Sequence, residues 1–256
     1  RSDVRIKRLL DALGWPAAQY SLNAGQVSVQ ASGQFSRANT LDHLYSVVEA
    51  EQGQLFVRGD GLVRYLDRHA RLKAPYTTEQ VILGDTGGTD RPYNHAELDY
   101  STRYLYNVAR VQRTGGAVQE RSNTTSTGTY GDRVISKTGL LLVDEASADS
   151  FASYLVAKYK DPFLFPSPVS YWPLVEGANL WPQALGRELS DRIRLKLSKA
   201  SATINDPYHL EGIEHRANAD GEWETTYMLG SADQRKYWVL GQTDYSELGT
   251  NTVLGF

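Results

Sequence analysis

The sequence predicts an α+β fold in which a small α/β domain, residues 1–92, is followed by a predominantly antiparallel β-barrel, residues 93–231, with an inserted helix. Two distant stretches carry this prediction. Leu210–Leu229 consists of two strand-like runs around an Asp-Gly pair, which is typical of the closing hairpin of a barrel. Gln119–Arg133 is rich in Ser, Thr and Gly and precedes a helical pattern, as expected for a connection inserted into that barrel.

The first helix is predicted at Val4–Leu13, because apolar side chains recur there at helical spacing. They are Ile6, Leu9, Leu10 and Leu13. Ser2 or Asp3 is the expected N-cap, since a short polar side chain can accept a hydrogen bond from a free backbone N–H. Gly14, followed by Pro16, is expected to end the helix.

A second helix is predicted at Leu41–Gln52, with Asn39 as its N-cap and Gly53 just beyond its end. Its buried face is expected to contain Leu41, Leu44, Tyr45 and Val48. Between the two helices, the alternation at Gln26–Gln30 predicts a short strand.

A tight hairpin completes the first domain. Two apolar runs, Leu55–Val57 and Leu62–Leu66, flank a Gly-Asp-Gly turn at residues 59–61. The glycine-rich segment Leu83–Pro92 is weakly hydrophobic, so we expect a loop there that leads into the second domain.

The barrel is predicted to begin with a long strand at Tyr104–Gln112, which turns at Thr114–Gly116 and returns at Ala117–Glu120. An inserted α/β segment follows at residues 121–162, and Ser147–Tyr159 is its helix. The apolar face of that helix is expected to contain Phe151, Leu155 and Tyr159.

The clearest strand of the chain is predicted at Arg192–Leu197, where apolar and basic residues alternate. Residues 232–256 are expected to form a C-terminal extension, and its last residues are apolar enough to need a partner surface. Because the chain starts at Arg1 and its only methionine is Met228, we expect it to be part of a longer polypeptide.

Composition narrows the possible functions. The 256 residues carry a net charge of −3 without a basic stripe, so we expect no sequence-specific nucleic-acid binding. DNA could still slide past a neutral or acidic surface of this kind. The absence of cysteine excludes disulfides and Cys-based zinc sites. No apolar run approaches the ~18 residues that cross a bilayer, so no membrane span is expected.

The sequence contains no recognisable catalytic pattern. Its five histidines lack metal-ligand spacing, and there is no nucleophile elbow. Glu97 and Asp99 could act as paired glycosidase carboxylates, but their i, i+2 spacing in a strand favours a solvated face. We therefore expect no enzymatic activity, no catalytic residue, no cofactor and no bound metal.

The tryptophans leave two alternatives open. Trp172 and Trp181 each stand directly before a proline in a stretch that looks irregular. Exposed aromatic rings either stack on sugars or fill protein interfaces. The pattern favours burial or subunit contact over sugar binding.

Taken together, residues 93–231 resemble the tail-hub, or baseplate-hub, proteins of bacteriophages and related contractile injection systems. The resemblance rests on the order of several short motifs. Leu-Tyr-Asn-Val at Leu105–Val108 lies in the first barrel strand, and Ser126–Arg133 resembles the Ser-x-x-x-Tyr-Gly-x-Arg segment that leaves the barrel. After the helix, Ser190–Ile193 resembles a Gly-Asp-x-Val strand, and His215–Thr225 resembles a His…Trp-x-Thr hairpin.

This resemblance implies structural or interface roles for six residues, namely Tyr130, Gly131, Arg133, His215, Trp223 and Thr225. One position departs from the family pattern, because Ser190 stands where the turn before Asp191 usually has Gly. Residues 1–92 look like the small α/β domain that precedes such a barrel. The overall texture of the sequence also resembles minor tail proteins from actinobacterial-type phages, and the preference for Arg over Lys fits a GC-rich source.

The resemblance also implies a function. Hub subunits form a homotrimer whose barrels make a pseudo-sixfold ring, which joins the tail tube to the tip and lines the DNA channel. The implied partners are tail-tube, distal-tail and tip or fibre proteins, with transient, non-specific passage of DNA. The implied location is the tail tip of the virion, after synthesis in the cytoplasm of the host bacterium.

Two alternatives remain beside the hub: a tail-associated cell-wall hydrolase and a carbohydrate-binding receptor module. The hydrolase predicts convergent carboxylates or a zinc site in a cleft. The receptor module predicts that several tryptophans are exposed on one surface, chosen from Trp172, Trp181, Trp223 and Trp238.

Overall fold

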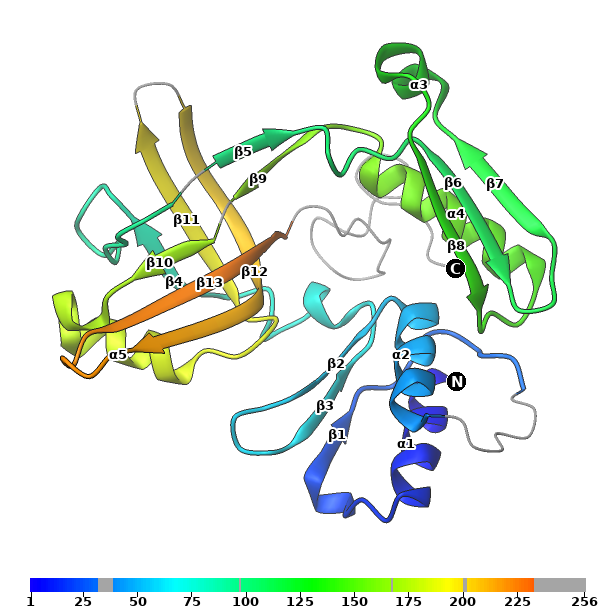
Figure 1. Cartoon of the computed structure of the whole chain (residues 1–256), viewed down its shortest axis with the longest axis horizontal. Helices are drawn as coiled ribbons and strands as arrows, with labels where there is room; N and C mark the ends of the chain where they lie inside the picture. Colours follow the sequence, from blue (N-terminus) through cyan, green and yellow to red (C-terminus); the bar gives the residue numbers. More distant parts are fainter. Residues whose placement is uncertain (32–38, 97, 167, 200–201, 233–256) are drawn as a thin grey trace. The chain divides into compact units, whose positions relative to one another are not determined.

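The chain forms a mixed α+β structure with four sheets among the described residues, as seen in a computed structural model (Figure 1). The structure describes residues 1–31, 39–96, 98–166, 168–199 and 202–232. Cα packing divides these residues into two units, each made of two separate stretches of sequence. Unit 1 contains residues 1–70 and 104–161, and unit 2 contains residues 71–103 and 162–232. The domain boundaries expected at residues 92 and 231 stay predictions, and residues 233–256 of the expected extension lie outside the described residues.

Unit 1 contains two sheets and four α-helices. The helices are α1 (Ser2–Ala12), α2 (Thr40–Glu51), α3 (Thr124–Tyr130) and α4 (Glu145–Tyr159). The first sheet contains β1 (Tyr20–Leu22), β2 (Gln54–Val57) and β3 (Val63–Leu66). The second sheet contains β6 (Val108–Arg113), β7 (Val118–Ser122) and β8 (Val134–Leu140). Two 3-10 turns, η1 (Ala17–Gln19) and η2 (Ala70–Leu72), lie after α1 and at the junction with unit 2.

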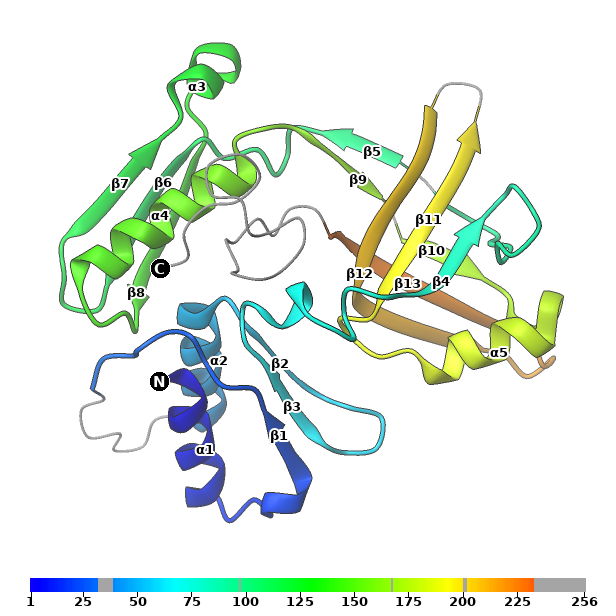
Figure 2. The same cartoon turned by 180° about the vertical axis from the view of Figure 1, so that it is seen from behind.

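The first sheet has the strand order β1-β3-β2, with β1 parallel and β2 antiparallel to β3. The predicted hairpin is therefore confirmed, and Gly61 adopts the positive φ that its turn requires. Helices α1 and α2 lie side by side in both views (Figures 1 and 2). Their buried side chains form one apolar core with those of β3, consisting of Ile6, Leu10, Leu44, Val47, Val63 and Tyr65.

Three local predictions for this part of the chain are wrong. Ser2 does not cap α1 but lies inside it, fully buried, because its hydroxyl donates to the carboxylate of Glu51. The buried face of α2 is rotated from the expected one, and Leu41 and Tyr45 are exposed while Val47 is buried. Gln26–Gln30 forms no strand, since only Val29 makes a bridge there. The Asn39 cap is confirmed by its 3.0 Å bond from the backbone N–H of Leu41.

The second sheet has the order β7-β6-β8, in which β7 is antiparallel and β8 parallel to β6. The parallel pairing of β8 was not predicted, nor was α3 in the crossover that makes it possible. Figure 1 shows α4 along one face of this sheet, where it buries Phe151 and Leu155 as predicted. The helix begins two residues before its predicted start because Asp144 caps it, accepting a 2.8 Å bond from the backbone N–H of Ser147.

Unit 2 consists of a five-stranded sheet, a two-stranded ribbon and one α-helix. The strands of the sheet are β4 (Glu79–Gly84), β10 (Val169–Tyr171), β11 (Arg192–Lys199), β12 (Ala202–Ala217) and β13 (Trp223–Ser231). The ribbon pairs β5 (Leu98–Ser101) with β9 (Phe163–Pro166). A 3-10 turn, η3 (Pro173–Glu176), leads into α5 (Gly177–Gly186), so the stretch around Trp181, which looked irregular, is helical.

The expected closed antiparallel barrel is wrong. The five strands have the order β10-β13-β12-β11-β4 and form a curled half-barrel (Figure 1), with β4 parallel to β11. Between the two edge strands, the segment 91–95 makes only isolated bridges, from Arg91 to Leu83 and from His95 to Ser170. Pro92 lies between these bridges and has no N–H to donate, which removes one possible ladder hydrogen bond there.

The strand predicted at Arg192–Leu197 and the hairpin around residues 220–221 are confirmed as β11 and as the β12–β13 pair. Their inward side chains form the core of unit 2, which includes Ile193, Leu195, Leu197, Leu210 and Tyr227. The hydroxyl of Tyr171 donates a 2.8 Å bond to that of Tyr227, which donates 2.6 Å to the Gln183 carbonyl in α5. Burial raises the pKa of Tyr171 to about 12, so this buried chain of hydrogen bonds stays protonated at neutral pH.

No helix within the described ranges combines the length and the apolar character that a bilayer crossing requires.

Candidate functional site

Three of the six residues singled out in the sequence meet on the β12–β13 hairpin. His215 and Thr225 are directly opposite each other in the strand register. The hydroxyl of Thr225 lies 3.1 Å from Nδ1 of His215 and accepts a 3.2 Å hydrogen bond from Nε1 of Trp223. Thr225 is fully buried, and its hydroxyl contacts both the imidazole of His215 and the indole of Trp223, so it orients both rings. Their role as an interface stays a prediction, whereas their mutual contact is a finding.

Trp223 is also held by rings on two other sides. The ring of Trp181, from α5, meets it edge-on at 5.5 Å between centroids with an angle of 65° between the planes. The imidazole of His215 lies 5.5 Å from it at 50°. An edge-to-face pair of this kind adds about 1 kcal/mol to the burial of the rings. Trp223 is therefore fixed in one orientation at the end of the hairpin.

A hollow opens beside Trp223. It has a volume of about 230 Å³ and is lined by Trp172, Leu174, Val175, Glu222 and Trp223. A second hollow of about 300 Å³ shares Trp172, Glu222 and Trp223 and adds a polar rim, formed by Arg216, Asn218 and Glu224 together with Ala217. We call these two together the aromatic hollow. Trp172, Leu174 and Val175 are 53%, 60% and 62% exposed, so the apolar wall of the hollow faces solvent.

The rim of the aromatic hollow is held by the hairpin turn. The side-chain oxygen of Asn218 accepts bonds from the backbone N–H groups of Asp220 (3.1 Å) and Glu222 (2.9 Å). Its amide nitrogen donates a 2.7 Å bond to Oε2 of Glu222. Nε of Arg216 donates 2.8 Å to Glu214. The carboxylate of Glu222 is thus oriented by the turn, and the charge of Arg216 is partly balanced.

The other three residues singled out, Tyr130, Gly131 and Arg133, belong to unit 1, and two of them, Gly131 and Arg133, are bonded to Asn107. The amide nitrogen of Asn107 donates 2.8 Å to the Gly131 carbonyl and 3.2 Å to the Ser126 hydroxyl. Its oxygen accepts a 2.8 Å bond from the backbone N–H of Arg133. Tyr130 and Arg133 themselves are exposed. The long strand predicted at Tyr104–Gln112 starts only at Val108, because Asn107 binds this loop.

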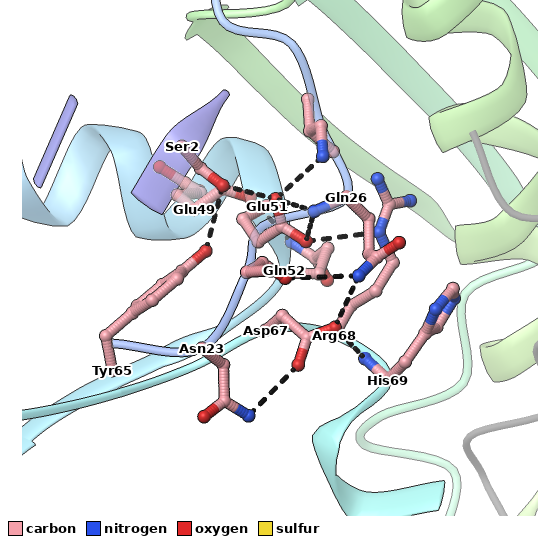
Figure 3. Close-up of polar contacts among 12 residues, drawn as sticks. Ser2, Asn23, Gln26, Glu49, Glu51, Gln52, Tyr65, Asp67, Arg68 and His69 are labelled. Carbon is pink, nitrogen blue, oxygen red and sulfur yellow. Dashed lines mark hydrogen bonds and ion pairs between the residues drawn. The ribbon is translucent and has the colours of Figure 1, made fainter. Parts of the chain in front are cut away.

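Unit 1 also contains a buried charged cluster that was not predicted from the sequence (Figure 3). Glu51 and Arg68 are both fully buried, with Nε of Arg68 3.5 Å from Oε1 of Glu51. The Glu51 carboxylate accepts bonds from the Ser2 hydroxyl (2.6 Å) and from the backbone N–H groups of Gln26 (3.1 Å) and Val27 (2.9 Å). Every acceptor position points to the protein itself, so the cluster ties α1 and the 26–27 segment to the end of α2 and offers no reactive group.

Within the described ranges, no three His, Asp or Glu side chains lie close enough together to hold a metal ion. Glu97, one of the two carboxylates considered for glycoside hydrolysis, lies outside the described residues, as does Trp238.

Comparison with known proteins gives a likeness in structure alone. No protein-family model matches the sequence, and no curated protein matches it. A tail protein from Neisseria meningitidis MC58 is similar in structure, with a TM-score of 0.61 and 11% sequence identity over 89% of this chain and 65% of that one. The 43 kDa tail protein of prophage MuSo2 from Shewanella oneidensis is similar with a TM-score of 0.60 and 11% identity over 90% of this chain and 66% of that one. The chain thus spans just under two thirds of the length of these proteins and shares with them the fold of a phage tail protein.

Proposed function

We propose that this protein is a structural component of a phage or phage-like tail, and more specifically a subunit of the hub at the tail tip. The observation that carries the proposal is the correspondence of fold with two tail proteins over about nine tenths of the chain. At 11% identity, what the chains share is the arrangement of the backbone. The preference for Arg over Lys supports an actinobacterial-type phage as the source.

The motifs behind the hub assignment also have a physical basis in the fold. The Leu-Tyr-Asn-Val motif and the Ser-x-x-x-Tyr-Gly-x-Arg motif are joined by the side chain of Asn107, which bonds Ser126, Gly131 and Arg133. Residues that depend on one another in this way are expected to be retained together. This supports the reading of the two motifs as one structural unit.

In the proposed role, the protein acts by geometry and without catalysis. Three subunits form a ring that joins the tail tube to the tip and surrounds the DNA channel, in contact with tail-tube, distal-tail and tip or fibre proteins. The net charge of −3 suits a wall along which DNA slides without being held. The assembled protein would reside in the virion at the tail tip, after synthesis in the host cytoplasm.

Light scattering of the purified protein over a concentration series, combined with negative-stain images, tests this proposal. A mass of three subunits and rings with a central hole would support it. A monomer at every concentration, also after mixing with the tail-tube protein of the same phage, would contradict it. Release of soluble fragments from purified bacterial cell walls would instead favour the hydrolase.

A further inference from the structure

The aromatic hollow is lined by Trp172, a large apolar side chain that lies half in solvent. Trp181 and Trp223 are partly buried against each other, whereas Trp172 is 53% exposed and is followed by the exposed Leu174 and Val175. Burial of an aromatic side chain stabilises the folded state. Exposed apolar surface beside a hollow is typical of a binding site.

The ring of Trp223 and the backbone at Trp172 are fixed before any ligand arrives. Trp223 is fixed by the Thr225 hydroxyl and by the ring of Trp181. Trp172 is the N-cap of η3, and the next residue, Pro173, is buried and restricts the backbone there. Preorganised rings lose little conformational entropy on binding, so even a small ligand can be held.

The polar residues at the rim of the hollow determine which class of ligand can bind. Glu222 and Glu224 place carboxylates at the edge of an aromatic floor, beside Asn218 and Arg216. A protein partner that covered these carboxylates with apolar surface would incur their desolvation, which costs several kcal/mol per charge. A saccharide instead offers hydroxyl donors for the carboxylates and a C–H face for the indole ring. The two carboxylates also disfavour an anionic ligand.

We propose that the aromatic hollow binds a neutral oligosaccharide, with one pyranose ring stacked on Trp172 and the next in the adjoining hollow near Arg216 and Glu224. The hydroxyls of the sugar rings donate to Glu222 and Glu224. The aliphatic stem and the guanidinium of Arg216 form one wall of the site for the second sugar ring. This goes beyond the structural role in the tail, which requires no ligand, and gives the subunit a means to contact a glycan surface.

Titration of the full chain with three neutral probes tests the proposal: triacetylchitotriose, cellotetraose and maltotetraose, followed by calorimetry and tryptophan fluorescence. We expect at least one probe to bind, and Trp172→Ala to weaken its binding by about tenfold or more, equivalent to about 1.4 kcal/mol. Trp15→Ala is the matched control, since Trp15 is 39% exposed and belongs to unit 1. It should change the affinity by less than about twofold.

Glu224→Gln gives a second test that keeps the apolar wall intact. It should lower the affinity for the neutral probe and raise that for trigalacturonate, whose carboxylates the wild-type rim repels. Failure of all three neutral probes to bind, or equal binding by wild type and Trp172→Ala, would overturn the proposal. So would self-association of the wild type that Trp172→Ala abolishes, because the hollow would then be a contact between subunits.

Discussion

The side-chain amide of Asn107 donates a 2.8 Å hydrogen bond to the backbone carbonyl of Gly131. The same side chain accepts a hydrogen bond from the backbone N–H of Arg133. It therefore bridges two segments of the chain that lie 24 residues apart in sequence. Asn107 is fully buried, and Gly131 has a φ of 70°, which lets the chain leave α3 and enter β8. One amide thus anchors the connection that runs from β7 through α3 to the start of β8.

We expect Asn107→Ala to lower the free energy of unfolding by about 3 kcal/mol, because it removes the three hydrogen bonds that this fully buried side chain makes to Ser126, Gly131 and Arg133. Urea denaturation followed by far-UV circular dichroism measures the change. Asn94→Ala is the control, since Asn94 is exposed and its replacement should cost less than about 0.5 kcal/mol. Equal stability of the two variants would show that the Asn107 contacts do not hold the loop.

The buried carboxylate of Glu51 allows a similarly matched comparison within one helix. Glu51→Gln replaces an acceptor of several hydrogen bonds by an amide whose NH₂ group faces other donors, next to the buried guanidinium of Arg68. We expect a loss of about 3 to 5 kcal/mol. Glu49→Gln, two residues earlier, removes a 2.7 Å ion pair to Lys137 that is about 40% exposed, and should cost less than about 1 kcal/mol. Similar losses for the two variants would contradict the assignment of Glu51 as a buried anchor.

What the sequence could predict was local. The Asn39 cap, the helix predicted at Ser147–Tyr159 and the alternation in β11 follow from neighbouring residues, and the structure confirms them, with the helix starting two residues earlier. The hairpin itself was predictable, but its register was not. A two-residue turn at 220–221 would place His215 opposite Thr226, whereas the observed pairing of Ala217 with Trp223 places His215 opposite Thr225.

What the sequence could not predict was long-range. The parallel pairing of β4 with β11 joins segments more than 100 residues apart, and nothing in either strand specifies the partner. Glu51 looks like any charged residue near a helix end, because its burial depends on Ser2 and Arg68 arriving from elsewhere. The approach of Trp172 to Trp223 likewise depends on how β10 pairs with β13.

Ser190 shows the cost of a departure from glycine. It has a φ of 76°, a left-handed conformation that favours Gly, while its hydroxyl accepts a 3.1 Å bond from Nε of Arg71. Ser190→Ala loses that bond and keeps the strain, whereas Ser190→Gly loses the bond and relieves the strain. We therefore expect Ser190→Ala to be less stable than Ser190→Gly by about 1 kcal/mol in thermal or urea unfolding. The reverse order would mean that the turn is not strained.

The ion pair of Glu79 with Arg194 links β4 to β11 and gives the stability a pH dependence. Arg194 donates to both carboxylate oxygens, at 2.6 and 2.9 Å, and these hydrogen bonds hold the pKa of Glu79 below its ordinary value of 4.5. A depressed folded-state pKa stabilises the protein above the ordinary value, and the contribution is lost as the pH falls toward the folded-state pKa.

Glu79→Gln should therefore lower the free energy of unfolding by about 1 kcal/mol at pH 7, because a neutral amide replaces one partner of the bidentate pair. The difference from wild type should stay constant from pH 7 down to about 5.5 and shrink below the ordinary pKa of a glutamate, as Glu79 of the wild type becomes protonated. Urea unfolding of both proteins between pH 3 and 7 measures this difference. Glu120→Gln is the control, because its pair with Arg110 is about half exposed and lies in unit 1. A difference for Glu79→Gln that does not change with pH would show that Arg194 contributes packing to the β4–β11 edge rather than charge.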